Sequence, residues 1–233
     1  AGAAMGAMAE AAPDIAMEAA TAMAEANPDA AGFAAQSMAD AVPEMAGEAA
    51  TAMMEAAPDA AGAIAGGVAR GDADIAAQVA TEMMESNPEM MGEIAGGVAQ
   101  MAPASAGDVA GAMVEANPDG AADMAASIAE NVPGAAGTVA GAIAEADPGL
   151  AAEAASAMME ANPATATQAA AGIANAAPEV AGDVAGAMME VAMDPAFSED
   201  FAASVAEANP DMSFEDIGAM AENFAGNAIG SIA

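Results

Sequence analysis

The chain lacks most of the side chains that catalysis and covalent cross-linking require. It has no Cys, His, Lys, Trp or Tyr, and Arg70 is its only basic residue. Without Cys there are neither disulfides nor thiolate metal sites. A Ser or Thr nucleophile would lack the base that usually activates it. Glycoside hydrolysis needs two differently tuned carboxyl groups in a cleft, whereas the acids here recur on a repeated surface. The composition predicts that the protein is not an enzyme.

The near absence of basic residues also limits the partners. With 36 acidic residues the formal net charge is −35, so the surface should repel both nucleic acids and anionic membranes, which bind through Lys and Arg. Disordered acidic chains are poor in apolar residues, but this chain is 56% hydrophobic, which predicts a folded protein. Acidic residues interrupt the apolar segments, and none reaches the length of a membrane span.

A proline recurs every fifteen residues along most of the chain. The series misses one step at Ala73, and two extra residues, Met193 and Asp194, shift its phase near the end. Its members are Pro13, Pro28, Pro43, Pro58, Pro88, Pro103, Pro118, Pro133, Pro148, Pro163, Pro178, Pro195 and Pro210. A fixed period of this kind predicts a repeat architecture.

Each unit, numbered from its proline, has the residues of a helix start. Position two is often acidic, which suits the positive end of a helix dipole, and proline fits the first helical turn. A polar residue at position fifteen is predicted to cap the following helix. These cap candidates are Asn27, Asn87, Asn117, Asp147, Asn162 and Asn209. Because the residue before proline disfavours helical geometry, each helix should span about eleven or twelve residues.

The side-chain pattern within a unit predicts an amphipathic helix. Positions four, seven, eight, eleven and fifteen fall on one side, where positions four and eight are mostly Ala and position eleven is a larger apolar residue. Positions two, six and thirteen lie opposite and hold most of the acids. Positions five and nine are usually small, as at Gly47 and Gly62, which should allow neighbouring helices to approach to about 8 Å.

Alternate units differ in sequence, so the structural period is thirty residues, the length of a helical hairpin. We therefore predict an all-α fold, an α-solenoid of short antiparallel helices with roughly seven hairpins. Residues 1–192 form the repeat array, in which residues 1–12 are a partial unit. Residues 193–233 form divergent, Phe-containing repeats or a cap.

The divergent C-terminal segment holds the candidate partner-binding residues. Four of the five Phe residues lie there, and its last nine residues carry no charge. These residues either form a bulkier hydrophobic cap or dock a protein partner or another copy through the repeat ends. The candidates are Phe197, Phe201, Phe214, Phe224, Ile229 and Ile232.

Two other repeated features predict weak binding sites. Stacked hairpins would align acids at position thirteen into a ladder that could bind Ca²⁺ through carboxylate oxygens. The candidate ligands are Glu25, Glu55, Glu85, Glu115 and Glu145. Thr21, Thr51 and Thr81, thirty residues apart, could instead face an ordered lattice such as ice. Paired methionines such as Met53–Met54 either fill the core or bind Cu(I), and core packing is the commoner role of Met.

These observations predict a non-enzymatic structural or scaffolding repeat protein with an acidic surface, which self-assembles or is a subunit of a larger assembly. The alternatives are a low-affinity Ca²⁺-binding protein and a lattice- or ice-binding protein. The first residues, Ala1–Gly2–Ala3–Ala4, lack an initial Met, which indicates either removal of an export signal or a trimmed chain. The first alternative predicts a secreted or periplasmic protein.

Overall fold

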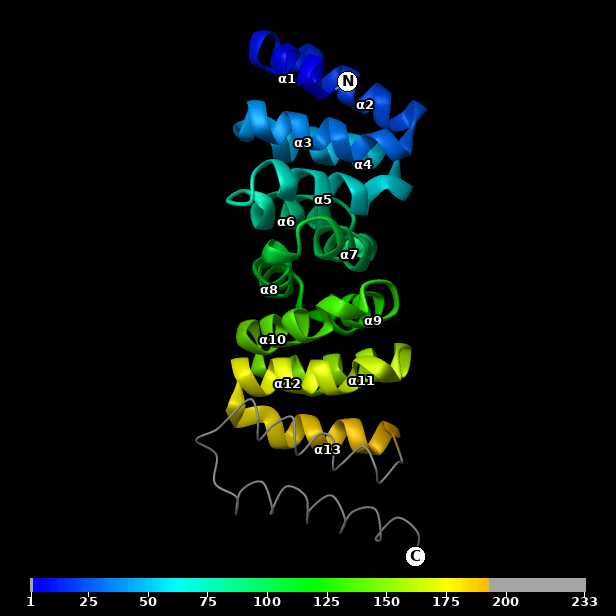
Figure 1. The fold of residues 1–233 in the computed structure, drawn as a ribbon, viewed down its shortest axis with the longest axis vertical. Helices are drawn as coiled ribbons and strands as arrows, with labels where there is room; N and C mark the ends of the chain where they lie inside the picture. The colour runs from blue at the N-terminus through cyan, green and yellow to red at the C-terminus, as the bar shows by residue number, and fades with distance from the viewer. Residues whose placement is uncertain (1, 193–233) are drawn as a thin grey trace, which may run out of the picture. The chain divides into compact units, whose positions relative to one another are not determined.

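A computed structural model describes residues 2–192 as α-helices joined by short turns, with no strand in that range (Figure 1). The chain divides into two compact units between Gly120 and Ala121. The first unit contains α1 (Gly2–Ala11), α2 (Pro13–Ala26), α3 (Ala31–Ala41), α4 (Ala46–Ala56), α5 (Ala61–Gly71), α6 (Ala76–Ser86), α7 (Met91–Met101) and α8 (Ala106–Ala116). The second contains α9 (Ala121–Asn131), α10 (Ala136–Ala146), α11 (Ala151–Ala161), α12 (Ala166–Ala176) and α13 (Ala181–Ala192).

Most units begin with a single 3₁₀ turn over the proline and the next two residues, and the α-helix starts only at position four. The turns are η1 (Pro28–Ala30), η2 (Pro43–Met45), η3 (Pro58–Ala60), η4 (Pro88–Met90), η5 (Pro103–Ser105), η6 (Pro118–Gly120), η7 (Pro133–Ala135), η8 (Pro148–Leu150), η9 (Pro163–Thr165) and η10 (Pro178–Val180). In η1 the Ala30 amide donates to the Asn27 carbonyl at 2.9 Å. The predicted length of about eleven helical residues is confirmed, as in α3.

The capping prediction is confirmed at some units and wrong at others. The Asp147 and Asn162 carboxyl and amide oxygens accept bonds from the Gly149 and Ala164 amides, at 2.9 and 3.1 Å. Asn27 and Asn87 make no side-chain cap bond. In the 3₁₀ turn the Ala30 amide already donates to the Asn27 carbonyl, so one of the free amides of the helix start has an acceptor without a polar side chain. Asn209 lies outside the described residues.

Asn162 makes a second bond that Asn27 lacks. Its Nδ2 donates to the Ala129 carbonyl of α9 at 2.9 Å, so the side chain joins a turn to a neighbouring helix. Replacing Asn162 with Ala should therefore lower the free energy of unfolding by about 1–3 kcal/mol. The matched Asn27→Ala change should stay within about 0.5 kcal/mol. Urea denaturation followed by circular dichroism measures both, and equal losses would contradict this assignment.

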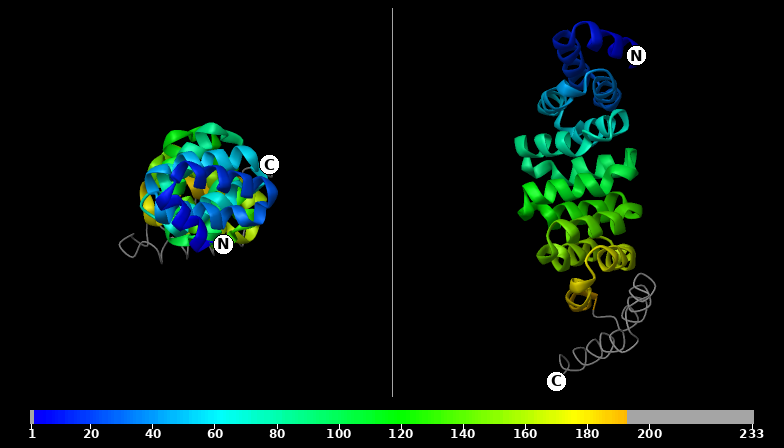
Figure 2. Two further views of the ribbon diagram at one scale, coloured as in Figure 1. Left: turned by 90° about the horizontal axis from the view of Figure 1, so that it is seen from above. Right: turned by 90° about the vertical axis from the view of Figure 1, so that its left-hand side faces the viewer.

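Helices two apart in the sequence lie side by side, which is the geometry of stacked hairpins. In the first unit α1, α3, α5 and α7 form one row and α2, α4, α6 and α8 the other, and consecutive helices pack between the rows (Figure 2). In the second unit α9, α11 and α13 form one row, and α10 and α12 the other. The predicted α-solenoid with a thirty-residue period is confirmed.

Small residues bring helices of one row into backbone contact. A Cβ on Gly62 of α5 would lie 2.7 Å from the Glu93 carbonyl oxygen of α7. A Cβ on Gly67 would meet the Gly32 backbone, and one on Gly97 would meet the Gly62 backbone. The predicted role of position five is confirmed, but its main partner is a glycine at position ten, which the sequence analysis did not single out.

The core is built mainly from Ala, with Met, Ile and Val as its larger side chains. Positions four, eight and eleven are buried in most units, as predicted. Position twelve is buried as well, which the sequence analysis missed. Position fifteen, which was placed on the same side as these positions, is exposed or half-buried in most units. The largest fully buried side chains are Met38, Met53, Met54, Ile64, Met83, Met84, Ile94, Met113, Met124, Ile128 and Ile143.

Candidate functional site

The predicted solvent face of the helices is present. Acids at positions two, six and thirteen are exposed wherever the structure describes their side chains. Glu25, Glu55, Glu85 and Glu115 stand near the C-terminal ends of α2, α4, α6 and α8, which form one row of the first unit. Glu145 has the same place on α10 in the second unit.

This row of carboxylates does not converge. Among the acidic side chains that the structure describes, no three are placed to share one metal ion. Helices of a row stand about 8–10 Å apart, whereas the oxygen ligands of Ca²⁺ lie at about 2.3–2.6 Å from the ion. Equivalent carboxylates on successive helices are therefore too far apart to bind one ion together. Binding of Ca²⁺ by this row of acids stays a prediction.

Because exposed acids are spaced regularly along the array, their repulsion should make the melting temperature depend on the salt concentration. Mobile ions screen exposed charges over about 8–10 Å at moderate ionic strength. The melting temperature should therefore rise by several degrees as NaCl increases from near zero, and more steeply with Ca²⁺. The double change Glu55→Gln and Glu85→Gln should weaken the salt dependence only slightly, because it removes two exposed charges from a chain with 36 acidic residues. A melting temperature independent of salt in the unaltered chain would contradict the repulsion argument.

The threonines of the proposed lattice-binding array are partly used inside the protein. Thr21, Thr51 and Thr81 are half-buried on α2, α4 and α6. The Thr21 and Thr81 hydroxyls each donate to a carbonyl four residues earlier in their own helix, at 2.9 Å. Those two hydroxyl protons are therefore not available to an external surface.

The paired methionines lie in the core. Met53, Met54, Met83 and Met84 are at most 2% exposed, and Met159 is 4% exposed. Their thioethers fill the space between the short side chains of Ala-rich helices. This confirms the core interpretation for the pairs Met53–Met54, Met83–Met84 and Met158–Met159.

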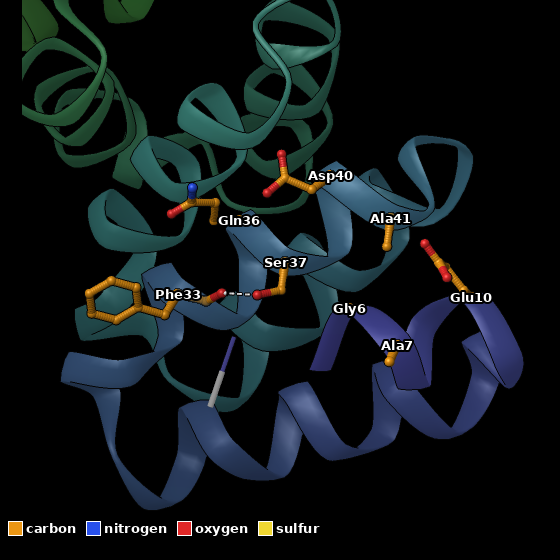
Figure 3. A pocket seen from close by; sticks show the side chains of 8 residues that line it. All are labelled: Gly6, Ala7, Glu10, Phe33, Gln36, Ser37, Asp40 and Ala41. Atoms are coloured by element: carbon orange, nitrogen blue, oxygen red, sulfur yellow. Dashed lines mark hydrogen bonds between the residues drawn. The ribbon is translucent and has the colours of Figure 1, made fainter. Parts of the chain in front are cut away.

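A groove between α1 and α3 is the main feature that the sequence analysis missed. It has a volume of about 520 Å³. From α1 it is lined by Gly6, Ala7 and Glu10, and from α3 by Phe33, Gln36, Ser37, Asp40 and Ala41. Figure 3 shows the Phe33 ring and the Glu10 carboxylate at opposite ends, with Ser37 between them. The Ser37 hydroxyl donates to the Phe33 carbonyl at 2.8 Å.

Phe33 is the unusual residue of this groove. It is the only Phe among the first 192 residues, and 62% of its surface is exposed. It occupies position six, where Glu18, Glu48 and Glu93 stand in other units. A Phe at a position that is usually acidic could have marked this residue in the sequence. The groove could not have been found in this way, because it depends on the spacing of two helices.

The predicted partner-binding residues of the C-terminal segment, Phe197, Phe201, Phe214, Phe224, Ile229 and Ile232, lie outside the described residues. Within residues 2–192 no helix is both long enough and apolar enough to cross a membrane. Comparison of the chain with models of protein families, with curated proteins and with solved structures found no match.

Proposed function

We propose that this chain is a non-enzymatic structural or scaffolding protein that presents an acidic surface and assembles with a protein partner or with itself. The observation that carries the proposal is that each helix has one face that packs against other helices and another that carries exposed acids. Apolar and small side chains are used in packing between helices, while the acids point outward one at a time. A surface of many separate charges suits multivalent contact with a complementary surface rather than chemistry at one centre.

The repeat supports the same proposal. Within residues 2–192 the main contacts of each helix are with helices one or two places along the chain, so the array can display the same surface element many times. A secreted or periplasmic location is part of the proposal, and localisation of the protein in fractionated cells of its source would test it.

The test is the state of the full chain in solution. Sedimentation velocity over a range of concentrations, with electron microscopy of the same samples, should show defined oligomers or a defined complex with a basic protein partner. Calorimetry with Ca²⁺ should show no stoichiometric saturable binding. A chain that stays monomeric, engages no partner and binds Ca²⁺ at fixed stoichiometry would overturn the proposal in favour of the cation-binding alternative.

A further inference from the structure

Beside the groove, α1 lacks a close backbone contact that α5 makes with α7 at the same unit position. A Cβ on Gly66 of α5 would lie 2.5 Å from the Gly97 carbonyl oxygen of α7. Gly6 has the same unit position on α1, yet a Cβ added there would meet nothing within 4 Å. The local sequence explains the difference, because α3 carries Gln36 and Ser37 where α5 and α7 carry pairs of glycines.

The lining combines one apolar end with two carboxylates. Phe33 offers an exposed aromatic ring, and Glu10 and Asp40 are both exposed at position thirteen of their helices. No basic residue precedes Arg70 in the sequence, so neither α1 nor α3 supplies a countercharge of its own. From Phe33 to Asp40 the helix rises about 10 Å, which is the reach of about three extended residues.

We infer that this groove binds a short basic segment of a different protein, with an Arg or Lys side chain at Glu10 and Asp40 and an apolar side chain about three residues away on Phe33. The inference rests on the proposed function and names the chemistry of its partner. Charge complementarity selects this occupant. Residues 193–233 contain no basic residue, and a second copy would bring another formal charge of −35. An aromatic ring at one end of the groove and carboxylates at the other favour a segment that carries both an apolar and a basic side chain over a segment with only one of them.

The experiment uses the full chain and a set of fluorescein-labelled hexapeptides. Each peptide carries one Arg or Lys and one Leu or Phe at a spacing of two to four residues. Paired controls replace the basic residue with Gln or the apolar residue with Ser. Fluorescence anisotropy at physiological salt should identify peptides that bind saturably and that lose binding in both controls.

Variants of the chain then locate the site. Phe33→Ala, and the pair Glu10→Gln with Asp40→Asn, should each weaken binding by about tenfold. Gly6→Leu should block the groove without removing any lining side chain, and the open space at Gly6 means that it should not lower the melting temperature. The control pair Glu55→Gln and Glu85→Gln removes the same charge elsewhere and should change binding less than twofold.

Three results would overturn the inference. One is the absence of saturable binding by every peptide. Another is binding that survives Phe33→Ala and Gly6→Leu, and the third is an equal loss in the control pair, which would show diffuse attraction to the acidic surface. Sedimentation of the Phe33→Ala chain separates this inference from the proposed function, because assembly that persists while peptide binding is lost leaves the scaffold proposal intact.

Discussion

Replacing Gly97 with Ala should lower the free energy of unfolding by about 3 kcal/mol, whereas replacing its neighbour Gly96 should raise it by up to about 1 kcal/mol. A Cβ at Gly97 would collide with the backbone of Gly62, which cannot move without displacing α5. A Cβ at Gly96 meets nothing within 4 Å, so only the gain in helix propensity remains.

Because the chain has no Trp or Tyr, circular dichroism in urea is the suitable measurement. Gly96→Ala is a close control, since it lies in the same helix and makes the same chemical change one residue away. Equal effects of the two substitutions would show that α5 and α7 do not approach as closely as described.

Truncating Met83 to Ala should cost about 2–5 kcal/mol, as expected for removing a large buried side chain and leaving a cavity. Met83 is 0% exposed, and a close-packed interior relaxes only partly around a deleted side chain, so the space would not be filled. The exposed Ile15, at 59%, is the matched control, and its replacement by Ala should change stability by less than about 0.5 kcal/mol.

The same denaturation experiment decides the outcome for both residues. A small effect at Met83 would mean that the surrounding helices close the cavity, and would contradict a tightly packed core. A large effect at Ile15 would place that side chain in an interface.

Much of the fold was predictable because proline restricts the backbone angles of its own residue and of the residue before it. Pro28 fixes the start of its unit and holds Asn27 extended, with φ −152°, so helix length follows from the repeat alone. The 3₁₀ turn was not predictable from propensity, because its bond from Ala30 to Asn27 depends on how the chain reverses between helices.

The fraction of each helix's circumference that is buried was harder to predict. A helix inside a solenoid contacts its hairpin mate and one neighbour on each side, so it buries more of its circumference than a two-layer helix. Met54 and Met84 at position twelve are buried for this reason, although a single-sided pattern places them near the edge.

The candidate site was only partly visible in the sequence. The exposure of the acids follows from helical periodicity, and it is confirmed at Glu55 and Glu85. The groove beside Phe33 could not be predicted, since it depends on the distance between Gly6 and Ser37, thirty-one residues apart in the sequence. Spacing between helices is a property of packed pairs and not of one periodic pattern.

The restriction of contacts to near neighbours has a consequence for how the chain folds. The side-chain bond from Asn162 to Ala129 spans 33 residues, and helices pair with partners one or two places along the chain. Closing loops of this length costs little entropy, so nucleation can begin at any hairpin and spread outward, at rates typical of proteins with low contact order. During synthesis, each hairpin can therefore dock on its predecessor as soon as it emerges. A defect such as Gly97→Ala should broaden the melting transition, because helices far from the lesion retain their own partners.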